Sequence, residues 1–237
     1  RGLVGSEMCI RDRDRAITRD IDWGVEVPLK NYEKKRIYVW FEAVIGYLSA
    51  SIEWAKSDKN ISNNKDIWKE WWQNPDSKHF YFQGKDNIPF HTIILPSILM
   101  GSGEYNLPYD VVANEYLNFS GKQFSKSKNW AVWVSDFLKE YDSEALRYYL
   151  SSIMPESSDS DFTWNSFFDS NNNELVATFG NLVNRIQSLI KSNFDNIIPD
   201  FETIDDVDNG MISAIKNSFD SAGNFLEKRQ FRNSLKE

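Results

Sequence analysis

The chain has 237 residues, of which 41% are hydrophobic and 15% aromatic, a composition typical of globular proteins that excludes a disordered chain. Its formal net charge of −8 argues against a protein that coats nucleic acid, although a local basic groove can still bind RNA. The single cysteine, Cys9, excludes an internal disulfide, and no Cys/His cluster has zinc-ligand spacing. No apolar run approaches the roughly 18 residues that span a bilayer. We therefore expect a soluble, cytoplasmic protein with no membrane partner.

The first thirteen residues, Arg1 to Arg13, show no helix or strand period and resemble translated sequencing-adapter sequence. They lack the long apolar core of a signal peptide, so we treat them as artefactual and leave them out of the fold argument. The chain begins without methionine and ends at Glu237 inside a helical pattern. We expect both ends to be cut.

Strands alternate with helices over the first half of the chain. Apolar spacing predicts strands at residues 36–41, at 79–83 and within 111–119, and helices at 43–55, within 57–76 and at 88–100. This alternation is typical of an α/β fold with a parallel sheet, in which ligands bind beyond the carboxyl ends of the strands. Trp40, Gly84 and Gly121 fall at or just after expected strand ends. We therefore expect them to belong to one shared site.

Beyond Trp133 the pattern becomes helical, so the second part is predicted to be all-α. Asp142 is the expected N-cap of a helix at 143–153, Pro155 ends that run, and residues 156–161 form a polar link. A long helix is expected at 167–194, followed by one or two helices within 208–237. The long helix carries an apolar stripe at three-to-four spacing, made of Leu175, Phe179, Leu182, Ile186 and Leu189.

The loop from Gly121 to Asn129 contains the triplet Ser125-Lys126-Ser127. A lysine supplies a mobile point charge, and serine hydroxyls and loop amides supply hydrogen bonds, which together suit a polyphosphate. Such a triplet is weak evidence by itself, because basic residues beside serines are common in solvated loops. Its meaning depends on the segments that precede it.

Two earlier segments supply this context: residues 40–47 have the sequence WFEAVIGY and residues 84–91 the sequence GKDNIPFH. In this order with the loop, they resemble the C-terminal part of methionyl-tRNA synthetases in their archaeal and eukaryotic-like form. In that family the loop is the second signature of class I synthetases, KMSKS, and here it is Gln123-Phe124-Ser125-Lys126-Ser127. The first lysine of the signature is missing, and Lys122 lies one residue earlier.

The resemblance implies the second half of a Rossmann-like class I catalytic domain followed by the start of an α-helical anticodon-binding bundle. On this basis residues 14–35 end the connective insertion and 36–130 belong to the catalytic domain. Residues 131–163 form a stem-contact linker, and residues 164–237 an incomplete anticodon-binding domain. The implied reaction is ATP-dependent activation of methionine to methionyl-adenylate, with Mg²⁺ accompanying ATP, and transfer of methionine to tRNA(Met).

The resemblance places the ATP chemistry on two segments. The implied catalytic residues are Lys126, Ser125, Ser127 and Lys122, and the implied ATP-binding residues are Gly84, Lys85, Asp86, Leu117 and Lys126. A mobile lysine stabilises the charge that develops on departing pyrophosphate. A glycine lets the backbone approach a flat base, and an aspartate accepts hydrogen bonds from ribose hydroxyls.

The implied methionine pocket is aromatic and apolar. Its residues are Trp40, Ala43, Tyr47, Asn87, Phe90 and His91. Such walls offer the methionine sulfur favourable edge contacts. Val44 replaces a proline that is common in the family. For His91 a structural hydrogen bond and a contact with the sulfur remain open alternatives, and His79 is expected to be structural.

Asn181 and Arg185 are four residues apart, so they share one face of the expected long helix. Residues 180–185 are similar to the segment that reads the tRNA anticodon in this family. An amide and a guanidinium can hydrogen-bond and stack on splayed bases of an RNA loop. An ordinary polar helix face is the alternative.

Two parts of a complete enzyme are missing from the 237 residues: the first nucleotide-binding signature, HIGH, and the zinc knuckle of the connective domain. We therefore expect no zinc site and no methionine activation by this chain alone. Three other interpretations stay open. They are another class I synthetase for an aliphatic amino acid, a non-catalytic tRNA-binding relative, and an unrelated nucleotide-binding α/β protein.

Overall fold

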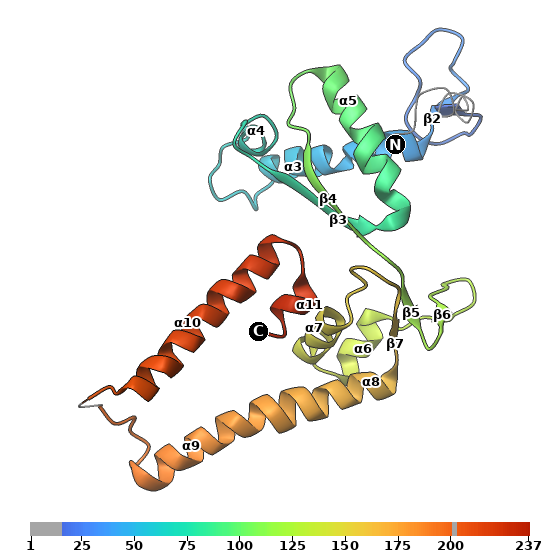
Figure 1. Ribbon diagram of the computed structural model, residues 1–237. Coiled ribbons are helices and arrows are strands. Elements are labelled where there is room, and N and C mark those ends of the chain that lie inside the picture. Colours follow the sequence, from blue (N-terminus) through green and yellow to red (C-terminus); the bar gives the residue numbers. More distant parts are fainter. Residues whose placement is uncertain (1–15, 201–202) are drawn as a thin grey trace, which may run out of the picture. The chain divides into compact units, whose positions relative to one another are not determined.

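The computed structural model describes residues 16–200 and 203–237, so the segment 1–13 lies outside the described residues. These residues form two compact units, one ending at Val111 and one beginning at Val112 (Figure 1). The division falls inside the segment 36–130 that was predicted to be one part of a catalytic domain.

The first unit alternates short strands with helices. Its elements are β1 (Thr18–Arg19), β2 (Arg36–Ile37), α2 (Val39–Glu42), the 3₁₀ turn η1 (Ala43–Ile45), α3 (Gly46–Lys56), α4 (Trp68–Trp72), β3 (His79–Gly84), the 3₁₀ turn η2 (Lys85–Asn87), the π-helical turn η3 (Phe90–Ile94), α5 (Leu95–Ser102) and β4 (Pro108–Asn114), whose last residues enter the second unit. The expected helix at 88–100 is confirmed as η3 and α5. It ends at Gly103, whose φ of 76° is the left-handed conformation that glycine adopts at helix ends.

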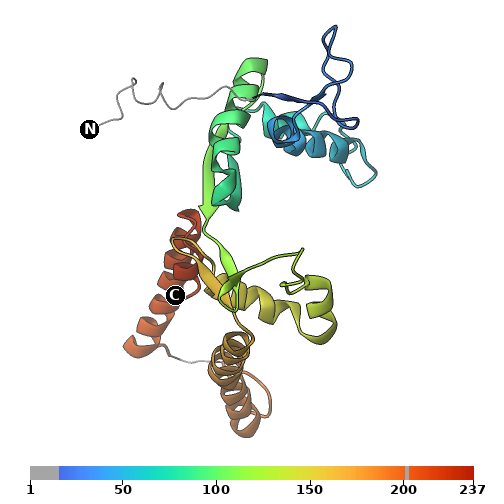
Figure 2. The same ribbon diagram turned by 90° about the vertical axis from the view of Figure 1, so that its right-hand side faces the viewer.

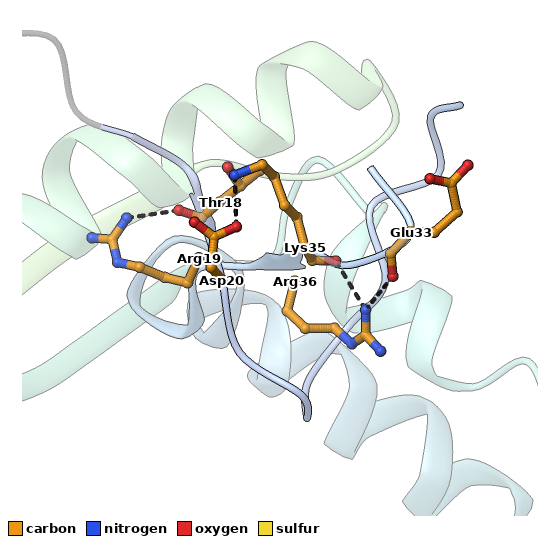
Figure 3. Close-up of polar contacts among 6 residues, drawn as sticks. All are labelled: Thr18, Arg19, Asp20, Glu33, Lys35 and Arg36. Atoms are coloured by element: carbon orange, nitrogen blue, oxygen red, sulfur yellow. Dashed lines mark hydrogen bonds and ion pairs between the residues drawn. The ribbon is translucent and has the colours of Figure 1, made fainter. Parts of the chain in front are cut away.

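The polypeptide enters this unit through an antiparallel pair of two-residue strands, β1 and β2. Figure 3 shows the polar contacts around it. Lys35 Nζ lies 2.7 Å from a carboxylate oxygen of Asp20, and the Arg36 guanidinium donates to the backbone carbonyls of Glu33 and Lys35. The Arg19 guanidinium lies 3.7 Å above the Tyr38 ring centroid. These contacts position the start of α2.

The predicted strand at 36–41 is wrong beyond Ile37. The backbone N–H of Tyr38 still donates to the carbonyl of Ile17. However, β1 is only two residues long, so it provides no strand partner for the residues after Tyr38. The chain instead turns into α2, with Tyr38 as its extended N-cap residue. Packing of the following turn, which buries Val44, therefore overrides the strand preference of the aromatic run.

The core of the first unit lies between β3, its partner strand β4 and the helices that precede and connect them. Its buried residues are Val44, Trp72, Tyr81, Leu95 and Leu99. Along β3 the side chain of Tyr81 is buried while its neighbours Phe80 and Phe82 are exposed, as strand alternation requires. The π-helical turn η3, which follows β3 and η2 in the chain, packs beside α2 and η1.

The second unit combines a small sheet with helices. Its elements are β5 (Leu117–Phe119), β6 (Lys122–Gln123), α6 (Val134–Glu140), α7 (Ser143–Ser152), β7 (Ser160–Phe162), α8 (Trp164–Asp169), the π-helical segment η4 (Ser170–Gly180), α9 (Asn181–Asn193), α10 (Asp206–Glu227) and α11 (Phe231–Ser234). The single strand expected within 111–119 is thus two strands, β4 and β5. The two strands belong to different sheets, and between them the N–H of Glu115 donates to the carbonyl of Pro155.

The central strand β5 pairs with β6 in antiparallel and with β7 in parallel orientation. The interpretation of residues 156–161 as a polar link is therefore wrong at its end, because Ser160 and Asp161 belong to β7. Because these two side chains are polar, the sequence did not indicate a strand here, although its third residue, Phe162, is buried. An aromatic cluster forms the core beneath this sheet, with Phe137, Tyr149, Phe162 and Phe167 buried.

The helices of the second unit follow the predicted order. Asp142 caps α7 by accepting from the N–H of Glu144, as expected. The long helix begins at Trp164, three residues earlier than predicted, and runs through α8, η4 and α9, as Figure 1 shows from the side and Figure 2 from one end. Its predicted apolar stripe is largely exposed, with Phe179 at 65% and Leu189 at 60%.

Candidate active site

The first unit brings the predicted methionine residues Tyr47, Asn87 and His91 into one hydrogen-bonded group. Tyr47 on α3 places its hydroxyl 2.8 Å from Nε2 of His91, which lies on η3. Nδ1 of the same imidazole lies 3.0 Å from the backbone carbonyl oxygen of Asn87. A carbonyl can only accept, so Nδ1 carries a proton; in a neutral imidazole Nε2 then accepts and the Tyr47 hydroxyl donates. The imidazole is buried.

Trp40 and Phe90 form a second pair beside this group. Their ring centroids are 5.7 Å apart with the planes tilted by 37°. Trp40 is 52% exposed, and Ala43 one turn later is also exposed. Val44, which stands where methionyl-tRNA synthetases commonly have a proline, is part of the buried core. The exposed aromatic faces are available to contact an apolar side chain.

A hollow of about 410 Å³ lies beside Tyr47. Its lining includes Tyr47 and Tyr81 but none of the other five predicted methionine residues. His79, predicted to be structural, also lines it, with Nε2 2.7 Å from the carbonyl oxygen of Trp71.

The predicted adenosine residues lie where β3 ends. Gly84 is the last residue of the strand, and a Cβ built on it would meet nothing within 4 Å. The backbone there faces open space, as close approach of a ligand requires. Lys85 and Asp86 follow in η2, one turn before Phe90 and His91. Leu117, the fifth predicted ATP residue, lies on β5 in the second unit and packs against its aromatic core.

The lysine-bearing loop is a hairpin in the second unit. Ser125 and Trp130 exchange two backbone hydrogen bonds of 2.9 Å, which close the loop between them. Within it the N–H of Asn129 donates to the carbonyl of Lys126, and the hydroxyls of Ser125 and Ser127 are 3.3 Å apart. Lys126 is exposed at the tip. The arrangement presents one mobile charge beside two hydroxyls, which suits a phosphate chain.

Lys122 has a different setting from Lys126. It lies on β6 at the base of the hairpin, and its Nζ is 5.1 Å from the ring centroid of Trp130. This cation–π contact directs the charge onto an aromatic face. Trp130 is itself fixed, because its Nε1 donates to the carbonyl of Phe119 at 2.9 Å.

Asn181 and Arg185 both lie on α9 and both are exposed. As predicted, they are one helical turn apart on the same face. The sequence motifs did not single out Tyr81, Trp130 or Asp161, whose carboxylate accepts from the backbone N–H of Gly121 at the start of the hairpin. Alternation along β3 is the one local signal that could have shown Tyr81 to be buried. The contacts of Trp130 and Asp161 form only when distant segments of the chain come together, so no local signal reveals them.

The sequence profile of the family described as tRNA synthetases class I (M) matches residues 7–187. The chain belongs to this family. Among its curated relatives, the methionine–tRNA ligase of Thermomicrobium roseum is 47% identical over 226 residues, which cover 95% of this chain and 38% of that protein. The methionine–tRNA ligase of Dehalococcoides mccartyi strain 195 is 59% identical over 178 residues, covering 75% and 31%. The resemblance to methionyl-tRNA synthetases is confirmed, and the chain spans about two fifths of the length of these relatives or less.

Solved structures of the family show the same fold. The crystal structure of Mycobacterium tuberculosis methionyl-tRNA synthetase bound by methionyl-adenylate matches with a TM-score of 0.79 at 24% identity, covering 98% of this chain and 43% of that chain. Its apo form matches with a TM-score of 0.72 at 23% identity, covering 93% and 40%. The predicted fold, part of a Rossmann-like class I synthetase with helices after it, is confirmed.

Two features are absent from the residues that the structure describes. Among 16–200 and 203–237, no three His, Cys, Asp or Glu side chains gather in a way that could hold a metal ion. Over the same residues, no helix has the length and apolarity needed to cross a membrane.

Proposed function

We propose that this chain is the part of a methionine–tRNA ligase that contains the methionine pocket, the second ATP signature and the first anticodon-binding helices. The enzyme would activate methionine with ATP and transfer it to tRNA(Met) in the cytoplasm. The hydrogen-bonded pair Tyr47 and His91 beside the rings of Trp40 and Phe90 carries this proposal, because it combines apolar walls with one fixed polar group.

In the proposed pocket the methionine side chain packs against Trp40, Phe90 and Ala43. Aromatic edges interact favourably with a thioether, and the site is otherwise apolar. The Tyr47 hydroxyl donates to His91, so the lone pairs of its oxygen remain for a weak contact with the ligand. Asn87 contributes through its backbone carbonyl, which keeps the imidazole in one tautomer.

In the proposed activation step, a carboxylate oxygen of methionine attacks the α-phosphorus of ATP. The bond to the bridging oxygen breaks, and pyrophosphate leaves with the electron pair and the Mg²⁺ that ATP carries as part of the substrate. Lys126 stabilises the charge that develops on the pyrophosphate, and Ser125 and Ser127 orient the loop. Gly84 and Asp86 hold the adenosine through backbone approach and ribose hydrogen bonds. Lys85 and Leu117 contribute further ATP contacts, and Lys122 supports the loop from its base.

The second step needs tRNA, and Asn181 and Arg185 are the proposed anticodon contacts. Both side chains are exposed on α9, which allows them to reach the edges and faces of unstacked bases. The proposed division of roles is therefore clear: the first unit selects the amino acid, and α9 selects the RNA.

Amino-acid-dependent exchange of pyrophosphate into ATP tests this function in the full-length protein that carries these residues. Methionine should support exchange, whereas leucine, isoleucine and valine should not. Exchange with an aliphatic amino acid would favour another class I synthetase. Binding of tRNA without any exchange would favour a non-catalytic relative. The 237-residue chain by itself should show no exchange.

A further inference from the structure

Tyr81 contacts both members of the Tyr47–His91 pair. It lies on β3, is 8% exposed, and belongs to the core of the first unit. Its ring meets that of Tyr47 edge-on at 5.3 Å between centroids, with an interplanar angle of 66°. The His91 ring lies 5.4 Å from it. The three rings therefore form a closed triangle, since Tyr47 and His91 are 5.6 Å apart.

The pair needs this third ring because Tyr47 is poorly enclosed. Its side chain is 46% exposed, so packing from the solvent side does not limit its rotation. Ser51 accepts a 3.0 Å hydrogen bond from Trp72 and donates at 2.9 Å to the backbone carbonyl of Tyr47, which fixes the main chain but not the ring. The ring is oriented by its contacts with Tyr81 and His91.

We propose that Tyr81 is a positioning residue for amino-acid specificity, holding the Tyr47 hydroxyl and His91 Nε2 in the one geometry that favours a thioether over a hydrocarbon side chain. This inference rests on the proposed function. Tyr81 acts through its ring, and it remains a neutral group: burial, followed by the proximity of Tyr47, raises the pKa of Tyr81 to about 12. It brings no charge to the pocket at neutral pH.

Two kinds of variant separate the ring from the hydroxyl. Tyr81→Phe keeps the ring, and Tyr81→Leu removes it; Tyr81→Met is a second ringless variant of similar length. Tyr105→Leu is the matched control, because Tyr105 packs on the same core through Trp68 and lies outside the triangle. Circular dichroism selects the variants that fold.

The measured quantity is the ratio of kcat/KM for methionine to kcat/KM for leucine in pyrophosphate exchange by the full-length protein. This ratio should fall about tenfold in the ringless variants, because their KM for methionine rises. The KM for ATP should not change, and Tyr81→Phe and Tyr105→Leu should keep the wild-type preference. An unchanged preference in folded Tyr81→Leu and Tyr81→Met would overturn the proposal.

A second measurement does not depend on the proposed function. In the full-length protein, a His91→Gln variant identifies the imidazole ¹⁵N signals of His91. The Asn87 carbonyl should hold the proton on Nδ1 in every variant, whereas the Nε2 signal should move toward that of an unbonded nitrogen in the ringless variants, because the Tyr47 hydroxyl is no longer held against it. If the wild-type protein lacks methionine-dependent exchange but the Nε2 signal responds in this way, the function fails while the positioning by Tyr81 stands. An unchanged Nε2 signal in the ringless variants would contradict that positioning.

Discussion

The backbone N–H of Gly121 donates to both carboxylate oxygens of Asp161, at 3.0 and 2.9 Å. This contact joins the start of the lysine-bearing hairpin to β7, which is 40 residues later in the sequence. Gly121 has a φ of 75°, a conformation that glycine adopts without strain. The base of the hairpin is therefore anchored while its tip, with Lys126, stays exposed.

Asp161→Ala should loosen the hairpin. A hydrogen bond to a charged group contributes about 1.5–3 kcal/mol, and this one stabilises the base of the hairpin. We expect faster tryptic cleavage after Lys122 and Lys126 and a lower kcat for adenylate formation in the full-length protein. Asp161→Asn, which keeps one acceptor oxygen, should be intermediate. Equal cleavage rates for all three proteins would contradict the anchoring role.

Lys126→Ala should lower kcat for pyrophosphate exchange by about 100-fold, because a single group that stabilises transition-state charge contributes on this scale. Lys128→Ala is the matched control, since Lys128 is exposed on the same hairpin and has no proposed role. Its effect should stay within about threefold. Similar losses in the two variants would mean that only the summed charge of the loop matters.

Arg185→Ala should reduce aminoacylation of tRNA(Met) by about tenfold or more, because one contact to an unstacked base contributes about 1–3 kcal/mol. Methionine-dependent pyrophosphate exchange without tRNA should be unaffected. Lys191→Ala, at the end of the same helix, controls for a general loss of positive charge. A parallel fall of exchange and aminoacylation in Arg185→Ala would argue against an anticodon contact.

The Tyr148 hydroxyl donates a 2.6 Å hydrogen bond to Glu174 and so joins α7 to η4. This hydrogen bond, followed by burial and the charge of Glu174, raises the pKa of Tyr148 to about 12. An unfolded tyrosine ionises near pH 10, so the unfolded state loses its proton first as the pH rises. The stabilisation is present below about pH 10 and is lost between about pH 10 and 12.

Urea unfolding of the wild type and of Tyr148→Phe checks this pH dependence. The free energy of unfolding should fall more steeply for the wild type over this range. Tyr81, whose pKa is also raised to about 12, contributes the same slope to both proteins and cancels in the comparison. Identical slopes would show that the Tyr148–Glu174 contact does not persist in solution.

Local signals were sufficient for most helices and for the resemblance. Asp142 and Gly103 mark helix ends through their own backbone preferences. The alternation along β3 could also have shown Tyr81 to be buried, although no prediction was made from it. The short strands were harder. The run after Arg36 has strong strand propensity, but its partner β1 is two residues long, and no local pattern reveals the length of a partner strand.

The site was predictable in its residue types and not in its internal contacts. The sequence placed Tyr47 and His91 in one pocket because each lies in a motif of the family. It did not show that the Tyr47 hydroxyl and the His91 imidazole form a hydrogen bond, since this contact depends on how α3 packs against η3. The contact of Asp161 could not be predicted for the same reason. Nothing in the polar sequence around this carboxylate indicates that it accepts a hydrogen bond from Gly121.

The KM for methionine of Tyr47→Phe tests the central claim most directly. In the full-length protein, methionine-dependent pyrophosphate exchange should show a KM for methionine raised about tenfold, since the partly buried hydrogen bond to His91 is lost while the ring remains. The KM for ATP should be unchanged. An unchanged KM for methionine, or exchange that does not require methionine, would contradict the account.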